Sequence, residues 1–223
     1  MQKLIYVWIL LMITGYSSNG NEWTILFDGH KVNGLRGYKQ QSFPKDNWSI
    51  ENGTLKTIPP TGIDLISEEI YKDFELELEW KVSPAGNSGI FYFATEDGDW
   101  IWQSALEMQV LDDEGHPDRN NNFPKRTAGS LYDLIGKGIK EKKYNPAGEW
   151  NHVRIVCKNY VVQHWLNGGK VLEYVYGSDE FKNLIANSKF ATMPYFAKAR
   201  AGHIGLQHHG EEVWYRNVRI RKL

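Results

Sequence analysis

The sequence predicts an all-β protein built as a two-sheet antiparallel β-sandwich with one short helix. Short runs of alternating apolar and polar residues recur along the chain after the first twenty residues. Turn residues such as Asn-Gly separate these runs, and only one segment carries a helical pattern. Many short strands with regular turn signals are typical of sandwiches, because each strand buries one face against a second sheet.

The first twenty residues predict a signal peptide rather than part of the fold. Lys3 supplies a short basic start, and residues 4–13 form an almost unbroken apolar run that small and polar residues follow. About ten apolar residues are too few to span a bilayer comfortably, but they fit the apolar region of a signal peptide. We therefore expect a signal peptide over residues 1–20, one domain over residues 21–223, and a periplasmic or secreted location. The alternative is an N-terminal anchor that stays uncleaved.

The composition suits a globular domain that binds neither nucleic acid nor a membrane surface. Of the 223 residues, 41% are hydrophobic and 24% are charged, and the formal net charge is -1. Such a balanced charge gives no electrostatic reason to expect a nucleic-acid or anionic-membrane partner. The single cysteine, Cys157, cannot form an intrachain disulfide, and its apolar neighbours predict a core position. The sequence has no zinc-ligand spacing and no phosphate-binding glycine loop.

The first half of the domain holds a predicted hairpin and the clearest single strand. Residues 48–50 and 54–57 flank Asn52-Gly53, and Asn-Gly between extended runs predicts a hairpin turn. Residues 74–82 alternate between apolar and charged side chains. Successive side chains of a strand point to opposite faces, so this strand buries one side and exposes the other. Further strands are predicted over residues 89–95, 105–111 and 130–135.

The second half continues as strands around the one predicted helix. Ser178 can cap a helix in which Phe181, Leu184 and Ile185 share one face. A turn at residues 167–169 joins two of the strands, and a turn at residues 209–210 joins two others. The predicted strands cover residues 151–158, 161–166, 170–176, 203–207 and 213–220.

Residues 106–113 are the first candidate for chemistry. The apolar residues at even positions should point to one face of the strand, so Glu107 and Gln109 share the other face. A bulge near Leu111 would bring Asp112 to the same side. Paired carboxylates at such a place suit general acid and base work on a sugar. The alternative is an ordinary solvent-facing polar side, which the charged residues of 74–81 illustrate.

Two further segments carry polar side chains that could line a site. Residues 112–122 form a loop rich in oxygen ligands that includes His116, although the spacing does not match an EF-hand. His208 and His209 are adjacent in an extended segment and should point to opposite faces, which makes them a poor metal pair. Arg216 follows on the next strand. The alternatives are a solvated loop in the first case and a buried or capped polar turn in the second.

Together these motifs resemble the 3-keto-disaccharide hydrolase family over about residues 23–223. The closing segment is the strongest part, and the strand around Glu107 matches the family's Glu-x-Gln-x-x-Asp pattern. Two positions differ: residues 91–94 lack the arginine that often follows the family's Asn-Ser-Gly strand, and Tyr215 stands where phenylalanine is usual. The residues that carry the resemblance are Leu26 to Gly29, Trp48, Asn52, Gly53, Tyr71, Asp73 to Leu76, Glu79 to Lys81, Asn87 to Ile90, Glu107, Gln109, Asp112, Gly129, Tyr132, Glu149 to Asn151, Leu166 to Gly168, Gly202, Ile204, Leu206, Gln207, His209, Gly210, Val213 and Arg216 to Val218.

The resemblance implies a concanavalin-like jelly roll whose groove binds a sugar oxidised at C3. A ketone at C3 acidifies the C2 hydrogen, so a base can take that proton while an acid protonates the departing C1 oxygen. Elimination followed by addition of water then completes hydrolysis. Glu107 and His116 are the candidate acid and base, and Asp112 could orient a catalytic group or bind a divalent metal ion. The candidate substrate contacts are Asn87, Gln109, Tyr132, Gln207, His209 and Arg216.

Two other functions fit the same fold. A non-catalytic carbohydrate-binding module would use the sandwich without a proton donor, and the fold alone does not exclude it. A retaining glucanase would need two carboxylates about 5–5.5 Å apart, whereas Glu107 and Gln109 supply only one. The prediction is therefore an enzyme that acts on 3-keto-glycosides, with the binding module as the alternative.

Overall fold

The computed structural model describes residues 22–60 and 62–223, which contain thirteen strands and one α-helix. The predicted signal peptide over residues 1–20 lies outside the described residues. One group of strands comprises β1 (Thr24–Phe27), β3 (Trp48–Glu51), β4 (Thr54–Thr57), β6 (Phe74–Val82), β9 (Asn151–Lys158), β10 (Val161–Leu166), β11 (Gly169–Val175) and β13 (Val213–Lys222). The other comprises β2 (Leu35–Gly37), β5 (Leu65–Ser67), β7 (Asn87–Ala94), β8 (Leu106–Leu111) and β12 (His203–Leu206).

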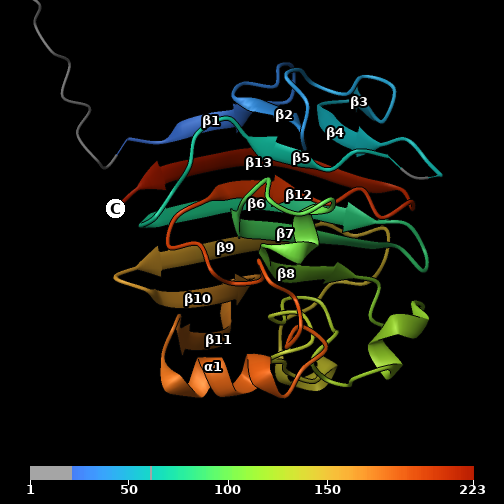
Figure 1. The fold of residues 1–223 in the computed structure, drawn as a ribbon. Helices are drawn as coiled ribbons and strands as arrows, with labels where there is room; N and C mark the ends of the chain where they lie inside the picture. The colour runs from blue at the N-terminus through green and yellow to red at the C-terminus, as the bar shows by residue number, and fades with distance from the viewer. Residues whose placement is uncertain (1–21, 61) are drawn as a thin grey trace, which may run out of the picture.

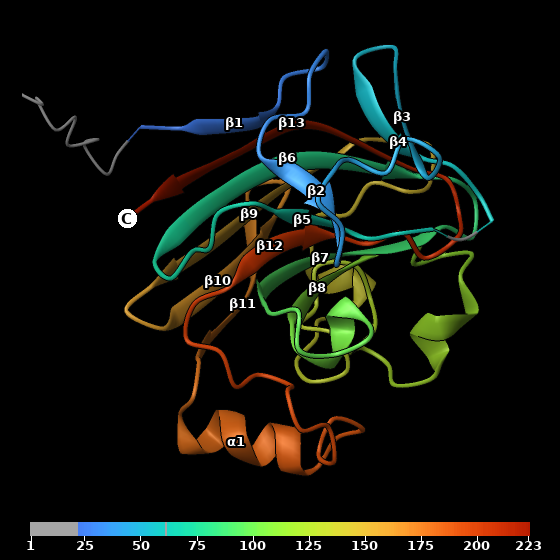
Figure 2. The same cartoon turned by 45° about the horizontal axis from the view of Figure 1, so that its top comes forward.

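The two groups form two antiparallel sheets, which Figures 1 and 2 show as curved layers packed on each other. The eight-stranded sheet has the order β11-β10-β9-β6-β13-β4-β3, with β1 pairing to β13 at the side. The five-stranded sheet has the order β2-β5-β12-β7-β8. This arrangement confirms the predicted two-sheet sandwich of the concanavalin-like type.

Two hairpin turns form where the sequence predicts them. Asn52 and Gly53 have φ angles of 50° and 74°, and Asn167 and Gly168 have φ angles of 46° and 77°. Two central residues with positive φ match the right-handed twist of the flanking strands, and Asn-Gly adopts this conformation readily. The turns therefore set the register of β3 against β4 and of β10 against β11.

The core lies between the sheets and is filled by alternate residues of the strands. In β6, the even-numbered side chains from Phe74 to Val82 are buried in this core, while Glu77, Glu79 and Lys81 on the other face are only partly buried. Cys157 is also in the core, as predicted. A smaller apolar cluster lies apart from the main core and includes Phe91 and Ile101. It packs where a 3-10 helix, Ile101–Gln103, crosses the outer face of the five-stranded sheet.

The predicted helix forms as α1 (Asp179–Ala186), at the β11 end of the molecule (Figure 1). The Ser178 side chain accepts a hydrogen bond of 3.1 Å from the Phe181 N–H, which caps the helix. Phe181 is buried in the core, and Leu184 and Ile185 pack against it. In the part of the chain that the structure describes, no helix is long and apolar enough to cross a membrane.

The strand predicted over residues 130–135 is wrong. Leu134 and Ile135 both donate backbone hydrogen bonds to the Leu131 carbonyl, and Asp133 has a φ of 62°, so the chain turns there. Only isolated bridges join Leu131 to Met108 and to Ile135. The short strands β1, β2 and β5 were not predicted, because three or four residues are too few to show a clear alternation.

Candidate active site

The candidate site lies on the outer face of the five-stranded sheet. Strand β8 turns its even-numbered residues into the core and leaves Glu107 and Gln109 on the other face, as its alternation predicts. Gly89 of β7 pairs with Gln109, and the Gln207 N–H donates to the Gly89 carbonyl over 2.9 Å. This register places Gly89 of β7 between Gln109 of β8 and Gln207, the residue that follows β12.

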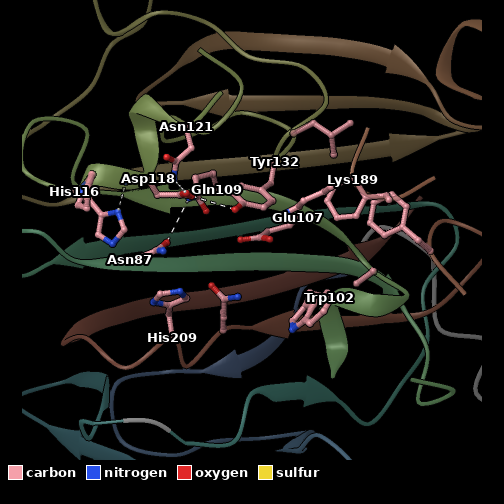
Figure 3. Close-up of a pocket in the computed structure, with 16 residues that line it drawn as sticks. Asn87, Trp102, Glu107, Gln109, His116, Asp118, Asn121, Tyr132, Lys189 and His209 are labelled. Atoms are coloured by element: carbon pink, nitrogen blue, oxygen red, sulfur yellow. Dashed lines mark hydrogen bonds between the residues drawn. The ribbon is translucent and has the colours of Figure 1, made fainter. Parts of the chain in front are cut away.

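A pocket of about 430 Å³ opens over this face (Figure 3). Its volume is within the usual range for sites that bind small molecules. Residues far apart in the chain meet there, from β7, β8, the loop after β8 and the segment after β12. Seven of the eight predicted acid/base and substrate-contact residues line it: Asn87, Glu107, Gln109, His116, Tyr132, Gln207 and His209.

Glu107 is the most unusual ionisable group of the pocket. Its relative exposure is only 8%. Burial raises the pKa of Glu107 to about 8, and the positive charges of Lys189 and His209 oppose this only in part. A carboxyl group with such a pKa is largely protonated at neutral pH and can donate a proton.

Two neighbours fix the position of the Glu107 carboxyl group. A Cβ atom at Gly89 would lie 2.3 Å from Glu107 Oε1, so only glycine leaves room for the carboxyl group beside β7. The side-chain amide of Gln109 can be oriented in two ways. In one, its nitrogen donates to Glu107 Oε1 and to the Ser88 carbonyl, each over 3.0 Å. In the other, which Figure 3 draws, its nitrogen makes one contact of 3.4 Å with Asn87 Oδ1, and we favour the first orientation because it provides a donor to two acceptors.

The turn around Ser130 holds the outer edge of β8. The Gln109 N–H donates to the Ser130 carbonyl over 3.0 Å, and the Tyr132 N–H donates to the Glu107 carbonyl over 2.9 Å. The edge of β8 is therefore paired although no further strand follows it. These bonds also bring the Tyr132 side chain into the pocket, where its hydroxyl donates to Asp118 Oδ2 over 3.1 Å.

Asp118 lines the pocket on a 3-10 helix, Pro117–Asn120, and the sequence did not single it out. Its Oδ1 accepts hydrogen bonds of 2.7 Å from Asn121 and from Arg126. Partial burial opposes ionisation, but these donors and the Tyr132 hydroxyl outweigh it and lower the pKa of Asp118. Asp118 is therefore a fixed anion whose lone pairs are largely used by protein donors.

Asp112 and Asp113, which follow β8, hold the loop. Asp112 Oδ2 accepts a hydrogen bond of 2.8 Å from the Ala85 N–H, and its Oδ1 accepts one of 3.1 Å from the Glu114 N–H. Asp113 forms a fully buried ion pair of 2.7 Å with Lys142. Within residues 22–60 and 62–223, no group of three acidic, histidine or cysteine side chains is arranged to hold a metal ion. The hydrogen bonds of Asp112 give it a role in fixing the loop, and its binding of a metal ion stays a prediction.

Two histidines face each other at one end of the pocket (Figure 3). The rings of His116 and His209 are 6.3 Å apart between centroids. His209 Nδ1 lies 2.8 Å from Glu211 Oε2, and His116 Nε2 lies 3.8 Å from Glu211 Oε1. His208 points the other way, and its Nε2 lies 3.0 Å from the Ile58 carbonyl. The prediction that only one of the adjacent histidines reaches the groove is confirmed.

Aromatic side chains form the other end of the pocket. Trp102 lies on the 3-10 helix that crosses the sheet, and 37% of it is exposed. Phe190 and Phe196 stack on each other with centroids 3.9 Å apart. Lys189 Nζ lies 4.3 Å from the centre of the Tyr132 ring. Exposed aromatic surface beside polar groups suits a sugar ring, which has apolar faces and polar edges.

Arg216 is the one predicted contact that lies elsewhere. It belongs to β13 in the eight-stranded sheet, on whose outer face it contacts the Glu79 carboxylate and lies 4.1 Å from the centre of the Trp150 ring. It does not line the pocket around Glu107. The prediction that Arg216 contacts substrate there is therefore corrected: the motif that contains it belongs to the opposite sheet.

The arrangement combines a protonated carboxyl group, a histidine paired with a carboxylate, and fixed hydrogen-bond donors around one cavity. Such a set can move a proton on to one atom of a bound molecule and off another. Sequence reasoning missed Trp102, Asp118, Lys189, Phe190, Phe196 and Glu211. Of these, two carried a usable signal: Asp118 lies in the candidate loop of residues 112–122, and Glu211 lies two residues after a predicted site histidine.

Comparison with known proteins places this architecture among carbohydrate-active proteins. A family model described as the 3-keto-alpha-glucoside-1,2-lyase-like domain matches residues 22–221. A protein of Bacteroides thetaiotaomicron named 3-keto-disaccharide hydrolase is 38% identical over 230 residues, which cover 89% of this chain and 77% of that protein.

Two crystal structures from Parabacteroides distasonis ATCC 8503, both described as candidate glycosyl hydrolases, share the fold. One has a TM-score of 0.79 with 26% sequence identity, covering 90% of this chain and 94% of that one. The other has a TM-score of 0.71 with 28% identity, covering 91% of this chain and 100% of that one.

Proposed function

The chain belongs to the family of 3-keto-alpha-glucoside-1,2-lyase-like domains, and we propose that it cleaves 3-keto-glycosides by elimination followed by hydration. In the first step a base removes the proton from C2, and the electron pair of that bond forms an enolate with the C3 ketone. The enolate then expels the C1 substituent, whose oxygen takes a proton from an acid. Water adds to C1 of the resulting enone while a proton returns to C2, which yields a 3-keto sugar.

The observation that carries this proposal is the buried carboxyl group of Glu107. Its pKa of about 8 keeps it protonated at neutral pH, and it faces the pocket from a rigid strand. An acid with these properties can protonate the departing C1 oxygen. Gln109 and Gly89 hold the carboxyl group in place, so little reorganisation is needed when the proton moves.

The rest of the pocket supplies binding and charge stabilisation. Asn87, Gln207 and Tyr132 offer hydrogen-bonding groups to the sugar hydroxyls, and Trp102 offers an apolar face. His116 accepts a hydrogen bond of 3.1 Å from the Asp118 N–H at Nδ1, so its Nε2 carries the hydrogen. We assign His116 as a fixed donor to the oxygen that becomes negative in the enolate.

Turnover of an oxidised and an unoxidised substrate tests the proposal. The purified protein is incubated with a 3-keto-glucoside and with the corresponding glucoside, and the released aglycone and sugar are measured. We expect cleavage of the keto form only, since the C2 hydrogen of an ordinary glucoside is not acidic. Cleavage of both forms would contradict the mechanism. Binding of sugar without cleavage of either would support the carbohydrate-binding module instead.

We also propose that the protein acts outside the cytoplasm. The apolar run over residues 4–13 supports this proposal. Expression of the full chain in its native host, followed by fractionation and N-terminal sequencing, tests it. We expect a periplasmic or secreted protein whose N-terminus starts near residue 21. A cytoplasmic protein that retains Met1 would contradict the prediction.

A further inference from the structure

Glu211 lies between the two histidines of the pocket and contacts each with a different oxygen. Its Oε2 is 2.8 Å from His209 Nδ1, and its Oε1 is 3.8 Å from His116 Nε2. The Glu211 carbonyl accepts a hydrogen bond of 2.7 Å from the Thr57 hydroxyl, which ties its backbone to β4. The backbone of Glu211 is therefore held by the end of β4, while its side chain lies near both imidazole rings.

The two histidines are held in different protonation patterns. His116 Nδ1 accepts the Asp118 N–H, so its remaining nitrogen, Nε2, is a hydrogen-bond donor in the neutral ring. His209 has the reverse arrangement. Partial burial opposes ionisation of Glu211, but the hydrogen bond with His209 lowers the pKa of Glu211, which is therefore ionised and can only accept. His209 Nδ1 must then carry the hydrogen, which leaves a free lone pair on Nε2.

The imidazole ring that carries this lone pair lines the pocket (Figure 3). Its side chain is 44% exposed, and its other nitrogen, Nδ1, lies against Glu211, so Nε2 is the nitrogen available to a bound molecule. The two pocket carboxyl groups are poorer acceptors of a proton. Glu107 is protonated at neutral pH, and the oxygens of Asp118 accept from Asn121, Arg126 and Tyr132.

We propose that His209 is the base that removes the C2 proton, and that Glu211 is the positioning residue that holds His209 in the tautomer able to accept it. This inference rests on the proposed function. The Nε2 lone pair forms a bond to the C2 hydrogen, and the C2–H electron pair moves into the C2–C3 bond. The π electrons of the C3 carbonyl move on to its oxygen. His209 becomes an imidazolium beside the Glu211 carboxylate, which stabilises its charge.

The charges that face His209 come from several elements. Glu211 is on its own segment, Glu107 is on β8, Asp118 and His116 are on the loop after β8, and Asp64 precedes β5. The hydrogen bond with Glu211 is the main reason that the pKa of His209 is raised above 6.5, and partial burial opposes it. The neutral base forms as the pH rises through this pKa, so proton removal should be weak in acid and reach a plateau above it.

Hydrogen exchange at C2 separates the base step from bond cleavage. The probe is 3-keto-1,5-anhydroglucitol, which has an acidic C2 hydrogen but no exocyclic leaving group at C1, so it has no glycosidic bond to cleave. Exchange in D₂O is followed by NMR, which resolves C2 from the other acidic position, C4. We expect the wild type to accelerate exchange at C2 and His209→Gln to lower that rate about 10²-fold or more.

The Glu211 variants test positioning. Glu211→Gln should lower the plateau rate of exchange by about 10-fold or more and move the acid limb of the pH profile to lower pH, because the imidazolium loses its anionic partner. Glu211→Asp, which keeps the negative charge, should have a plateau rate and an acid limb that lie between those of Glu211→Gln and the wild type. Glu212→Gln is the matched control: Glu212 pairs with Lys56 at 2.6 Å and does not line the pocket, so it should leave the profile unchanged.

The same variants are assayed on a cleavable 3-keto-glucoside with deuterium at C2, so that the result does not depend on probe binding. Circular dichroism and calorimetric binding of the sugar check that each variant is folded. Full exchange and cleavage in His209→Gln, in an enzyme whose wild type cleaves the keto substrate, would overturn the base assignment. An unchanged pH profile in Glu211→Gln would overturn the positioning role. A wild type that neither exchanges nor cleaves would overturn the proposed function itself.

Discussion

Strands β6 and β8 both turn glutamates to the outer face of their sheets, yet the surroundings of these glutamates are opposite. On β6, Glu75 contacts Arg154 and Arg221. Its neighbours Glu77 and Glu79 contact Arg219 and Arg216. On β8, Glu107 accepts no hydrogen bond from a cation among the residues that the structure describes, and burial dominates its pKa.

An alternating pattern therefore locates a carboxylate on one face of a strand but does not determine its function. On the larger sheet, arginines from β9 and β13 cross to the glutamates of β6, and the same cations stack on tryptophans such as Trp23 and Trp150. Partial burial opposes ionisation of Glu75, but its two arginines outweigh it, so the pKa of Glu75 is lowered. Pairing keeps Glu75 ionised at neutral pH, whereas Glu107 can gain and lose a proton near neutral pH.

Glu107→Gln should lower activity more than any other substitution proposed below, and it should make the folded protein more stable at high pH. Loss of the acid should lower kcat/KM on a 3-keto-glucoside about 10²-fold or more. A shift in pKa from 4.5 to about 8 means that the ionised form costs the folded state up to about 5 kcal/mol. Because the folded pKa is the higher one, this cost is absent below the unfolded pKa and is reached in full above about pH 8.

Chemical denaturation at about pH 4 and about pH 9 checks the second half of this prediction, because the cost is absent at the first pH and complete at the second. The Glu107→Gln variant should resemble the wild type at the lower pH and should be the more stable protein at the higher pH. Near-normal activity would remove Glu107 from the mechanism. Equal stability of the two proteins at both pH values would show that the carboxyl group is not held in its neutral form.

Gly89→Ala should weaken the site through a single steric contact. The new Cβ would lie 2.3 Å from Glu107 Oε1, so the carboxyl group must move. We expect kcat/KM to fall about 10-fold and stability to fall by about 1–3 kcal/mol. In a Glu107→Ala background the same substitution should cost far less stability, because the clash is gone. Equal destabilisation in both backgrounds would show that Gly89 serves another purpose.

The fold was predictable where alternation and turn chemistry are local. The period-two pattern of residues 74–82 predicted β6 with its correct faces, and Asn52-Gly53 predicted the hairpin turn. The strand predicted over residues 130–135 does not form, because the backbone of this segment forms hydrogen bonds with β8 and within its own turn. Such pairing depends on the edge that β8 offers in three dimensions, which no local pattern records.

The site was predictable only as far as strand faces and motifs reach. The alternation of β8 correctly placed Glu107 and Gln109 on the same face. Alternation does not show which sheet a strand joins, however, and the prediction therefore assigned Arg216 of β13 to the wrong sheet. Lys189, like the stacked Phe190 and Phe196, comes from an irregular segment after α1. These residues reach the pocket through long-range packing, which is not encoded in short-range periodicity.

Glu75→Gln should affect stability and leave activity unchanged, the reverse of Glu107→Gln. Its side chain is 5% exposed, while the two arginines are about one-third exposed and partly solvated. Removing the charge should cost about 1–3 kcal/mol, less than for a fully buried pair. The folded pKa of Glu75 is lowered, so this contribution is present above the unfolded pKa and is lost as the pH falls through the folded one. Chemical denaturation at several acidic pH values measures this contribution. Loss of activity in a folded Glu75→Gln variant would show that β6 as well as β8 carries a functional glutamate.

Glu77→Gln should have the smallest effect, although it is the same chemical change on the same strand. Its partner Arg219 is 45% exposed and also lies 4.5 Å from the centre of the Trp23 ring. Water and salt screen such a pair, and the arginine keeps its aromatic contact when the carboxylate is removed. We expect a loss of about 0.5 kcal/mol or less and unchanged kcat/KM. A larger loss than for Glu75→Gln would mean that burial does not determine how much each β6 glutamate stabilises the fold, and burial alone would then not distinguish Glu107 from the glutamates of β6.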